Sequence, residues 1–271
     1  MKNVLWWIPR MLILGTLIFL IFLIFGPLAN LLLWSVAEKW FYPHLLPNEW
    51  GFAFWKRVFS PRGVAWEALG NSVLVAVFTV LASLSLAIPA GYALARLPLP
   101  ARGLILLVFL IPQAFPNLTV YVNIARLFYQ WGLNGTLLGV VLVHTVHGLV
   151  FAVWIASAAF SAVGREMEQA ARSIGAGPWR AFVDITLPLA MPGLMASAIF
   201  VFLESLDEFT GSYFVGAPDV QMMPLLLYTA GAGGNYQIAS ITALVLLIPS
   251  VLFMLVVERF LKADVMARIG K

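Results

Sequence analysis

Charged residues are scarce in this chain, and cysteine is absent. Only 10% of the 271 residues are Asp, Glu, Lys or Arg, against about 25% in soluble domains. The hydrophobic share is 62%, above the about 45–50% that is usual for soluble domains. These proportions exclude an ordinary soluble domain and predict an all-α polytopic membrane protein. Without cysteine, the chain forms no disulfide and no thiolate-ligated zinc or iron–sulfur site.

A phosphate-binding loop of the form G-x-x-x-x-G-K-[ST] is also absent. In that motif the backbone and the lysine cradle nucleotide phosphates, whereas the only Gly-Lys pair of this chain is Gly270–Lys271 at the C-terminus. The chain is therefore not expected to be an ATP-hydrolysing enzyme. Any energy from ATP must enter from another subunit.

Six apolar segments are each long enough for a membrane-spanning helix, which needs about 20 residues. They cover roughly residues 11–34, 71–94, 103–129, 136–160, 194–214 and 238–261. The first is too long for the apolar region of a signal peptide and no A-x-A cleavage signal follows it, so we expect a retained span. The third contains Pro112 and Pro116, which favour a kink. The prediction is a single transmembrane domain over residues 1–271.

Basic residues collect on one side of the expected helices. Six spans put both termini on the same side, and that side holds eleven of the 16 Lys and Arg residues. They are Lys2, Arg10, Arg96, Arg102, Arg165, Arg172, Arg180, Arg259, Lys262, Arg268 and Lys271. The positive-inside rule then places both termini and the 163–193 loop in the cytoplasm, and the aromatic-rich 37–67 loop outside it.

Residues 163–193 are the longest polar interruption in the second half of the chain. Residues 168–174 favour a helix with an acidic start, which suits the helix dipole, and Gly175 and Gly177 then break it. Pro178 can begin a second helix, which we expect Pro188 and Pro192 to end before the next span. A helical hairpin lying on lipid is one interpretation, and a docking site for another protein is the other.

Small residues in this loop have an informative spacing. Ala170, Ala171 and Gly175 would let another protein approach closely. They belong to the run Q-A-A-x3-G-x9-I-x-L-P, formed by Gln169, Ala170, Ala171, Gly175, Ile185, Leu187 and Pro188. This run resembles the EAA motif of permease subunits of binding-protein-dependent ABC importers. The similarity extends over about residues 71–259.

The resemblance implies that residues 163–193 form a coupling-helix loop, which seats in a cleft of a cytoplasmic ATPase subunit. The residues expected at this contact are Glu168, Gln169, Ala170, Ala171, Gly175 and Ala176. The glutamate that names the motif is replaced by Gln169, with Glu168 just before it. Whether Glu168 or Gln169 makes the polar contact stays open at this point.

The resemblance also implies a fold and a set of partners. The fold is the six-helix type I ABC importer permease fold, located in the cell inner membrane as a multi-pass protein. The expected partners are a dimer of cytoplasmic ATPase subunits, a second homologous permease, an extracytoplasmic solute-binding protein and membrane lipid, with no nucleic acid. ATP and Mg would be bound by the ATPase, and no cofactor is expected in this chain.

Three acidic residues lie in the fifth expected span. Glu204, Asp207 and Glu208 are spaced i, i+3 and i+4, which places them on one face of a helix. Carboxylates are costly in the bilayer core, so they should face protein or water, where they would attract a cation. Asn117 and Tyr121 of the third span are further candidates for the solute path.

The stretch F-L-E-S-L-D-E-F, residues 202–209, resembles the corresponding span of permeases of the polyamine-type branch. It favours a polyamine-like organic cation as the solute. A sugar or another polar solute is the alternative, because sugar importer permeases share the motif. The acids could instead pair with an arginine of a partner permease or cap a broken helix.

Two histidines lie three residues apart in the fourth expected span. His144 and His147 share a face, but they lack a third ligand and the H-E-x-x-H pattern, so hydrogen bonds to neighbouring helices are favoured over a metal site. Two other functions stay open. One is a stand-alone secondary transporter that uses the acids of the fifth span as an ion relay, and the other is a membrane-embedded hydrolase built on the histidines.

Overall fold

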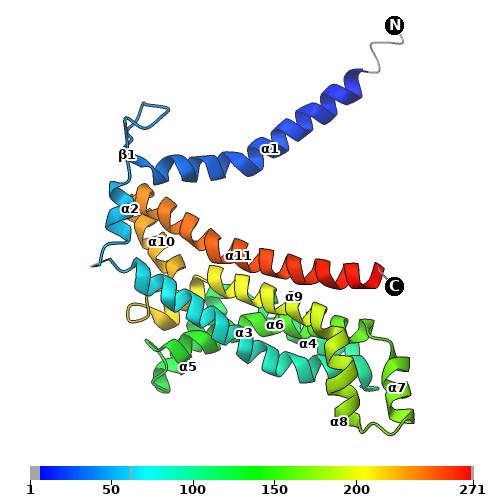
Figure 1. Ribbon diagram of the computed structural model, residues 1–271. Coiled ribbons are helices and arrows are strands. Elements are labelled where there is room, and N and C mark those ends of the chain that lie inside the picture. The colour runs from blue at the N-terminus through cyan, green and yellow to red at the C-terminus, as the bar shows by residue number, and fades with distance from the viewer. Residues whose placement is uncertain (1–6, 62, 270–271) are drawn as a thin grey trace. The chain divides into compact units, whose positions relative to one another are not determined.

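The computed structural model describes residues 7–61 and 63–269, and nearly all its elements are helices (Figure 1). Lys2 and the pair Gly270–Lys271 lie outside the described residues. Within these ranges five helices are long and apolar enough to cross a membrane, and the count is six if one bent pair is a single span. The predicted all-α polytopic fold is confirmed.

One compact unit comprises Met1–Ala65 and Leu226–Val245. It contains α1 (Trp7–Ser35), β1 (Ala37–Lys39), β2 (Glu49–Trp50), α2 (Ala53–Val58), most of α10 (Met223–Ala232) and the start of α11 (Tyr236–Ile269). Trp34 packs against Trp40 and Tyr236, with ring centroids 4.4 and 5.2 Å apart. The antiparallel β1–β2 pair, which the sequence did not predict, is closed by an ion pair of 2.7 Å between Lys39 and Glu49.

The other unit comprises Trp66–Leu225 and Leu246–Lys271. Its long helices are α3 (Ala65–Arg96), α6 (Leu137–Ala162) and α9 (Leu187–Asp207). Thr136 caps α6, because its Oγ1 accepts the backbone N–H of Gly139 at 3.0 Å. Helices α6 and α9 pack against each other extensively. The buried residues of this contact include Ala152, Ala156 and Val201, and small side chains of this kind let membrane helices approach closely.

The third expected span is broken rather than kinked. It consists of α4 (Arg102–Ala114) and α5 (Asn117–Gln130), which meet at 90°. The residue before a proline avoids helical backbone angles. Phe115, which precedes Pro116, accordingly has φ −96° and ψ 149°, and the helix ends there.

The polar loop folds into α7 (Arg165–Ser173) and α8 (Pro178–Ala181), which lie together at one end of this unit (Figure 1). The expectation that Pro188 and Pro192 end the second helix was wrong, since a helical path runs through the π-helical turn η1 (Phe182–Thr186) into α9. Pro188 is the second residue of α9 and has no N–H to bond back into the preceding turn. The wider turn η1 comes just before it, where the helical bond from residue 188 is lost.

Candidate functional site

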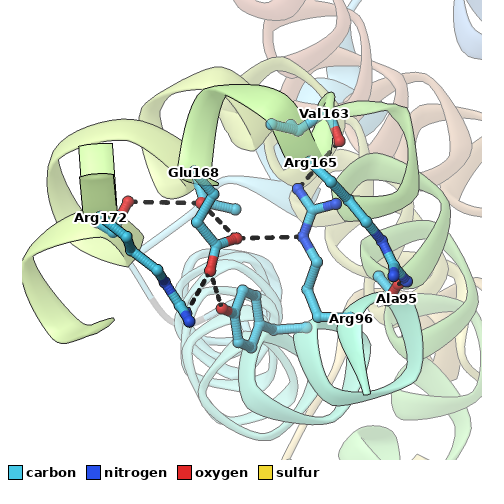
Figure 2. Close-up of polar contacts among 9 residues, drawn as sticks. Ala95, Arg96, Val163, Arg165, Glu168 and Arg172 are labelled. Carbon is cyan, nitrogen blue, oxygen red and sulfur yellow. Dashed lines mark hydrogen bonds and ion pairs between the residues drawn. The ribbon is translucent and has the colours of Figure 1, made fainter. Parts of the chain in front are cut away.

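Glu168 is the centre of the polar loop, and its side chain points into the protein rather than out of it (Figure 2). Its side chain is only 10% exposed although it lies on the short surface helix α7. A buried carboxylate needs charged or hydrogen-bonding partners, because burial penalises the ionised form. The residues around Glu168 supply both.

Two arginines neutralise this carboxylate. Arg172, one turn further along α7, places its Nη2 2.7 Å from Oε1 of Glu168. Arg96, the last residue of α3, places its Nε 3.4 Å from Oε2. Two hydroxyl groups complete the shell: Tyr92 of α3 donates to Oε1 at 3.0 Å, and Thr186 of η1 donates to Oε2 at 3.3 Å. The carboxylate therefore joins α7 to η1 and to α3, which is distant in sequence.

Two further hydrogen bonds connect the same segments through the backbone. Arg96 Nη2 donates to the carbonyl of Val163 at 3.0 Å, and Arg165 Nη2 donates to the carbonyl of Ala95 at 3.2 Å (Figure 2). The last turn of α3 is thus bonded to the beginning of the loop at Val163 and Arg165 as well as to Glu168. A pocket of about 220 Å³ opens beside this network and is lined by it together with Leu97 and Gln169.

The other residues predicted for the ATPase contact have different positions. Gln169, Ala170 and Gly175 are exposed, Ala176 is half-buried and Ala171 is buried. Gly175 has φ +94°, a conformation that L side chains rarely adopt, and it ends α7. In this chain Glu168 makes the polar contacts inside the protein, whereas the amide of Gln169 is exposed at the surface.

Sequence reasoning missed three partners of Glu168, namely Tyr92, Arg96 and Thr186. Arg96 was counted only as a cytoplasmic charge, and Thr186 is the variable position of the I-x-L-P run. A signal existed, because Glu168 lies three residues before Ala171 and therefore on the same face of a helix, and that face is the buried one.

A second polar cluster lies between the long helices. Tyr121 of α5 donates to Oε2 of Glu208 at 3.1 Å, and His147 of α6 lies 2.8 Å from Oε1 of Glu204. Gln113 of α4 lies 3.0 Å from the same imidazole nitrogen. The cluster therefore joins both halves of the broken span to α6 and to the end of α9.

Of the three acids predicted to share one helical face, Glu204 and Glu208 reach this cluster and Asp207 does not. The helix α9 ends at Asp207, and Glu208 follows it with an extended backbone of ψ 103°. Glu208 Oε1 instead accepts the N–H of Gly211 at 2.7 Å, so this residue caps the next helical turn, which leads into η2 (Ser212–Gly216). Asp207 and Asn117 are exposed and do not join the cluster.

The two histidines have hydrogen-bonding roles, as predicted. His144 is buried and contacts the hydroxyl groups of Ser205 at 2.8 Å and Ser212 at 3.0 Å, and His147 contacts Gln113 and Glu204. Within residues 7–61 and 63–269 no group of three or more His, Asp or Glu side chains is arranged to hold a metal ion.

Comparison with known proteins agrees with this architecture. Residues 87–264 match the family model described as "Binding-protein-dependent transport system inner membrane component". The chain belongs to this family. Its members are permease subunits of ABC transporters, so this permease is a multi-pass inner-membrane protein and not an enzyme.

Curated relatives include several permeases. The putative 2-aminoethylphosphonate transport system permease protein PhnV of Salmonella typhimurium is 28% identical over 252 residues, which is 92% of this chain and 93% of the relative. The diacetylchitobiose uptake system permease protein NgcG of Streptomyces coelicolor is 34% identical over 65% of this chain and 58% of the relative. The alpha-glucoside transport system permease protein AglG of Rhizobium meliloti is 28% identical over 86% and 63%.

Solved structures confirm the type I importer permease fold. A chain of a bacterial ABC transporter involved in the import of the acidic polysaccharide alginate superposes with a TM-score of 0.68 at 17% identity, covering 96% of this chain and 97% of that one. A chain of the MetNI methionine ABC transporter superposes with a TM-score of 0.61 at 19% identity, covering 72% and 94%.

Proposed function

We propose that this permease forms the solute path of an ABC importer and is driven through residues 163–193 by a separate ATPase dimer. The observation that carries the proposal is the surface of the loop. Gln169, Ala170 and Gly175 are exposed on α7 and its end, where small side chains permit close approach, while the buried carboxylate of Glu168 holds α7 to α3. The cytoplasmic position of the loop, inferred from the basic residues, agrees with this role.

The remaining partners follow from the importer architecture. They are a second homologous permease and an extracytoplasmic solute-binding protein. Two observations support them. A structural neighbour was solved with its pentasaccharide-bound periplasmic protein. In addition, the side chains at positions 11–25 of α1 are exposed and almost all apolar, a surface suited to lipid or to another membrane subunit.

Co-purification tests this assignment. The permease, purified from its own cells in mild detergent, should retain an ATPase subunit in stoichiometric amount. Solute uptake in proteoliposomes should then need ATP and the binding protein. Uptake by the purified chain alone under a proton or sodium gradient would establish the secondary transporter instead.

The solute is proposed to carry a protonated amine, as polyamine-like organic cations do. The support is the intramembrane cluster, where Glu204 and Glu208 place two carboxylates beside the hydroxyl group of Tyr121. The name of one relative, a 2-aminoethylphosphonate permease, also includes an amine. Carboxylates inside a membrane protein commonly mark ion or substrate pathways.

A sugar is the equally supported alternative, because two of the relatives are named for diacetylchitobiose and alpha-glucosides. Binding of labelled spermidine, 2-aminoethylphosphonate and trehalose by the cognate solute-binding protein separates these classes. Binding of either amine would support the proposal. Binding of the sugar alone would overturn the proposal of an amine solute and leave the permease assignment intact.

A further inference from the structure

We propose that Arg96 is a positioning residue that clamps α7 to the last turn of α3. As a result α7, which is the proposed coupling helix, and the membrane-spanning helix α3 move as one body during transport. The proposal rests on the function proposed above. It assigns a role to a residue outside the loop and names the helix that receives the motion of the ATPase.

The clamp has several parts that all reach one turn of α3. Within that turn Tyr92 donates to Glu168, Arg96 pairs with Glu168 and donates to the carbonyl of Val163, and the carbonyl of Ala95 accepts from Arg165. Bonds to side chain and backbone at separate points restrain both the position and the rotation of α7 relative to α3. A single contact would allow α7 to rotate about that contact.

Burial makes the central ion pair hard to open. The side chains of Arg96 and Glu168 are 8% and 10% exposed, so the pair is shielded from the water that weakens surface ion pairs. Separating them would leave a buried charge without its partner, which proteins avoid strongly. The clamp is therefore expected to hold while the loop is pushed or pulled.

Arg172 neutralises the same carboxylate but cannot serve as the clamp. It lies on α7 itself, four residues from Glu168, and its side chain is 48% exposed. Its ion pair therefore stays within one helix and joins no other element. Loss of Arg172 should leave α7 bonded to α3, and this makes it the matched control for Arg96.

The absence of cysteine permits a direct test by pulsed EPR. Leu97 and Ser173 are exposed residues at the ends of α3 and α7, and neither carries a clamp contact. Spin labels on the Leu97→Cys and Ser173→Cys pair report the distance between the two helices in the assembled transporter. We expect the same narrow distribution without nucleotide and after trapping with ATP and vanadate. A shift between the two states would overturn the proposal, whatever any substitution does.

Substitutions supply the second readout. Arg96→Gln should broaden the EPR distribution and lower the uptake per ATP hydrolysed by about 5-fold or more, the usual size of a lost coupling interaction. Arg96→Lys, which keeps the charge, should partly restore both the narrow EPR distribution and the uptake per ATP hydrolysed. Arg172→Gln should resemble the wild type in both measurements. Equal effects of Arg96→Gln and Arg172→Gln would refute the clamp.

The EPR distance can also be measured in the permease alone, in detergent. If no ATPase binds, the proposed function fails, but the labels still report whether Arg96 holds α7. A narrow distribution that Arg96→Gln leaves unchanged in the permease alone would overturn the clamp independently of the ATPase.

Discussion

Nε2 of His147 lies 2.8 Å from Oε1 of Glu204, which joins α6 to α9 within the membrane-spanning part of the chain. The second oxygen of Glu204, Oε2, is buried and has no hydrogen-bond partner among the described residues. The carboxylate therefore depends on His147, which also contacts Gln113 of α4. The intramembrane cluster should therefore be sensitive to the loss of the imidazole ring of His147.

Replacing His147 should destabilise the permease. His147→Leu would leave the carboxylate of Glu204 without this partner, and an unsatisfied buried polar group costs about 1–3 kcal/mol. The melting temperature of the detergent-solubilised protein, followed by tryptophan fluorescence, should fall. His147→Gln retains an amide donor and should fall less. Identical melting curves for wild type and His147→Leu would show that the contact does not contribute to stability.

The acids of the cluster should affect uptake unequally. Glu204→Gln and Glu208→Gln remove charge from the cluster, whereas Asp207→Asn removes the same charge from an exposed position one helical turn or less away. If the solute is an amine, the first two substitutions should raise KM for uptake by about 10-fold, equivalent to about 1.4 kcal/mol, and the third should not. An equal change in KM for all three substitutions would show that this cluster does not line the solute path.

Periodicity and hydropathy predicted most of the fold, because long apolar helices depend on their own backbone bonds and on lipid rather than on distant partners. The exceptions lie where a proline or a polar side chain determines the local backbone conformation. Phe115 is extended because Pro116 follows it, which turns a kink into a right-angle break. Glu208 leaves the helix because its carboxylate caps the next turn. The antiparallel strands near Lys39 are too short to give a pattern.

The candidate sites were predictable only in part. The motif located α7 and its exposed small residues, but it could not tell which way Glu168 points. That direction depends on Arg96, which is 72 residues earlier in the chain and reaches Glu168 only when α3 packs beside the loop. Tyr121 was selected from sequence, and its partner Glu208 was selected separately, yet their contact required the folded arrangement of α5 against the end of α9.

Close approach of α3 and α6 should depend on Gly91. A Cβ atom at this position would lie 2.7 Å from Cβ of Ala156 and 2.8 Å from the backbone nitrogen of Ser157, so Gly91→Ala must push the helices apart. Overpacking of this kind costs about 1–3 kcal/mol. Gly70→Ala is the control on the same helix, because a Cβ there meets nothing within 4 Å. The yield of monodisperse protein in size-exclusion chromatography should drop for the first variant only, and a normal yield of Gly91→Ala would contradict the packing.

The turn that ends α7 should tolerate a side chain at one glycine and not at the other. A Cβ atom added at Gly175 or at Gly177 would meet only open space, but Gly175 has φ +94° and Gly177 has φ −65°. Alanine at position 175 therefore adopts a strained backbone at a cost of about 1–3 kcal/mol, whereas alanine at position 177 adopts an ordinary one.

Strain at Gly175 should displace the end of α7 and lower the uptake supported by each ATP hydrolysed. Gly175→Ala should therefore reduce coupling while the permease stays in the membrane, and Gly175→Asp, which adds a charge to the same strain, should reduce it further. Gly177→Ala should transport normally. The ratio of solute uptake to phosphate release in proteoliposomes measures this directly. Normal coupling in Gly175→Asp would mean that the surface formed by this turn is not where the ATPase acts.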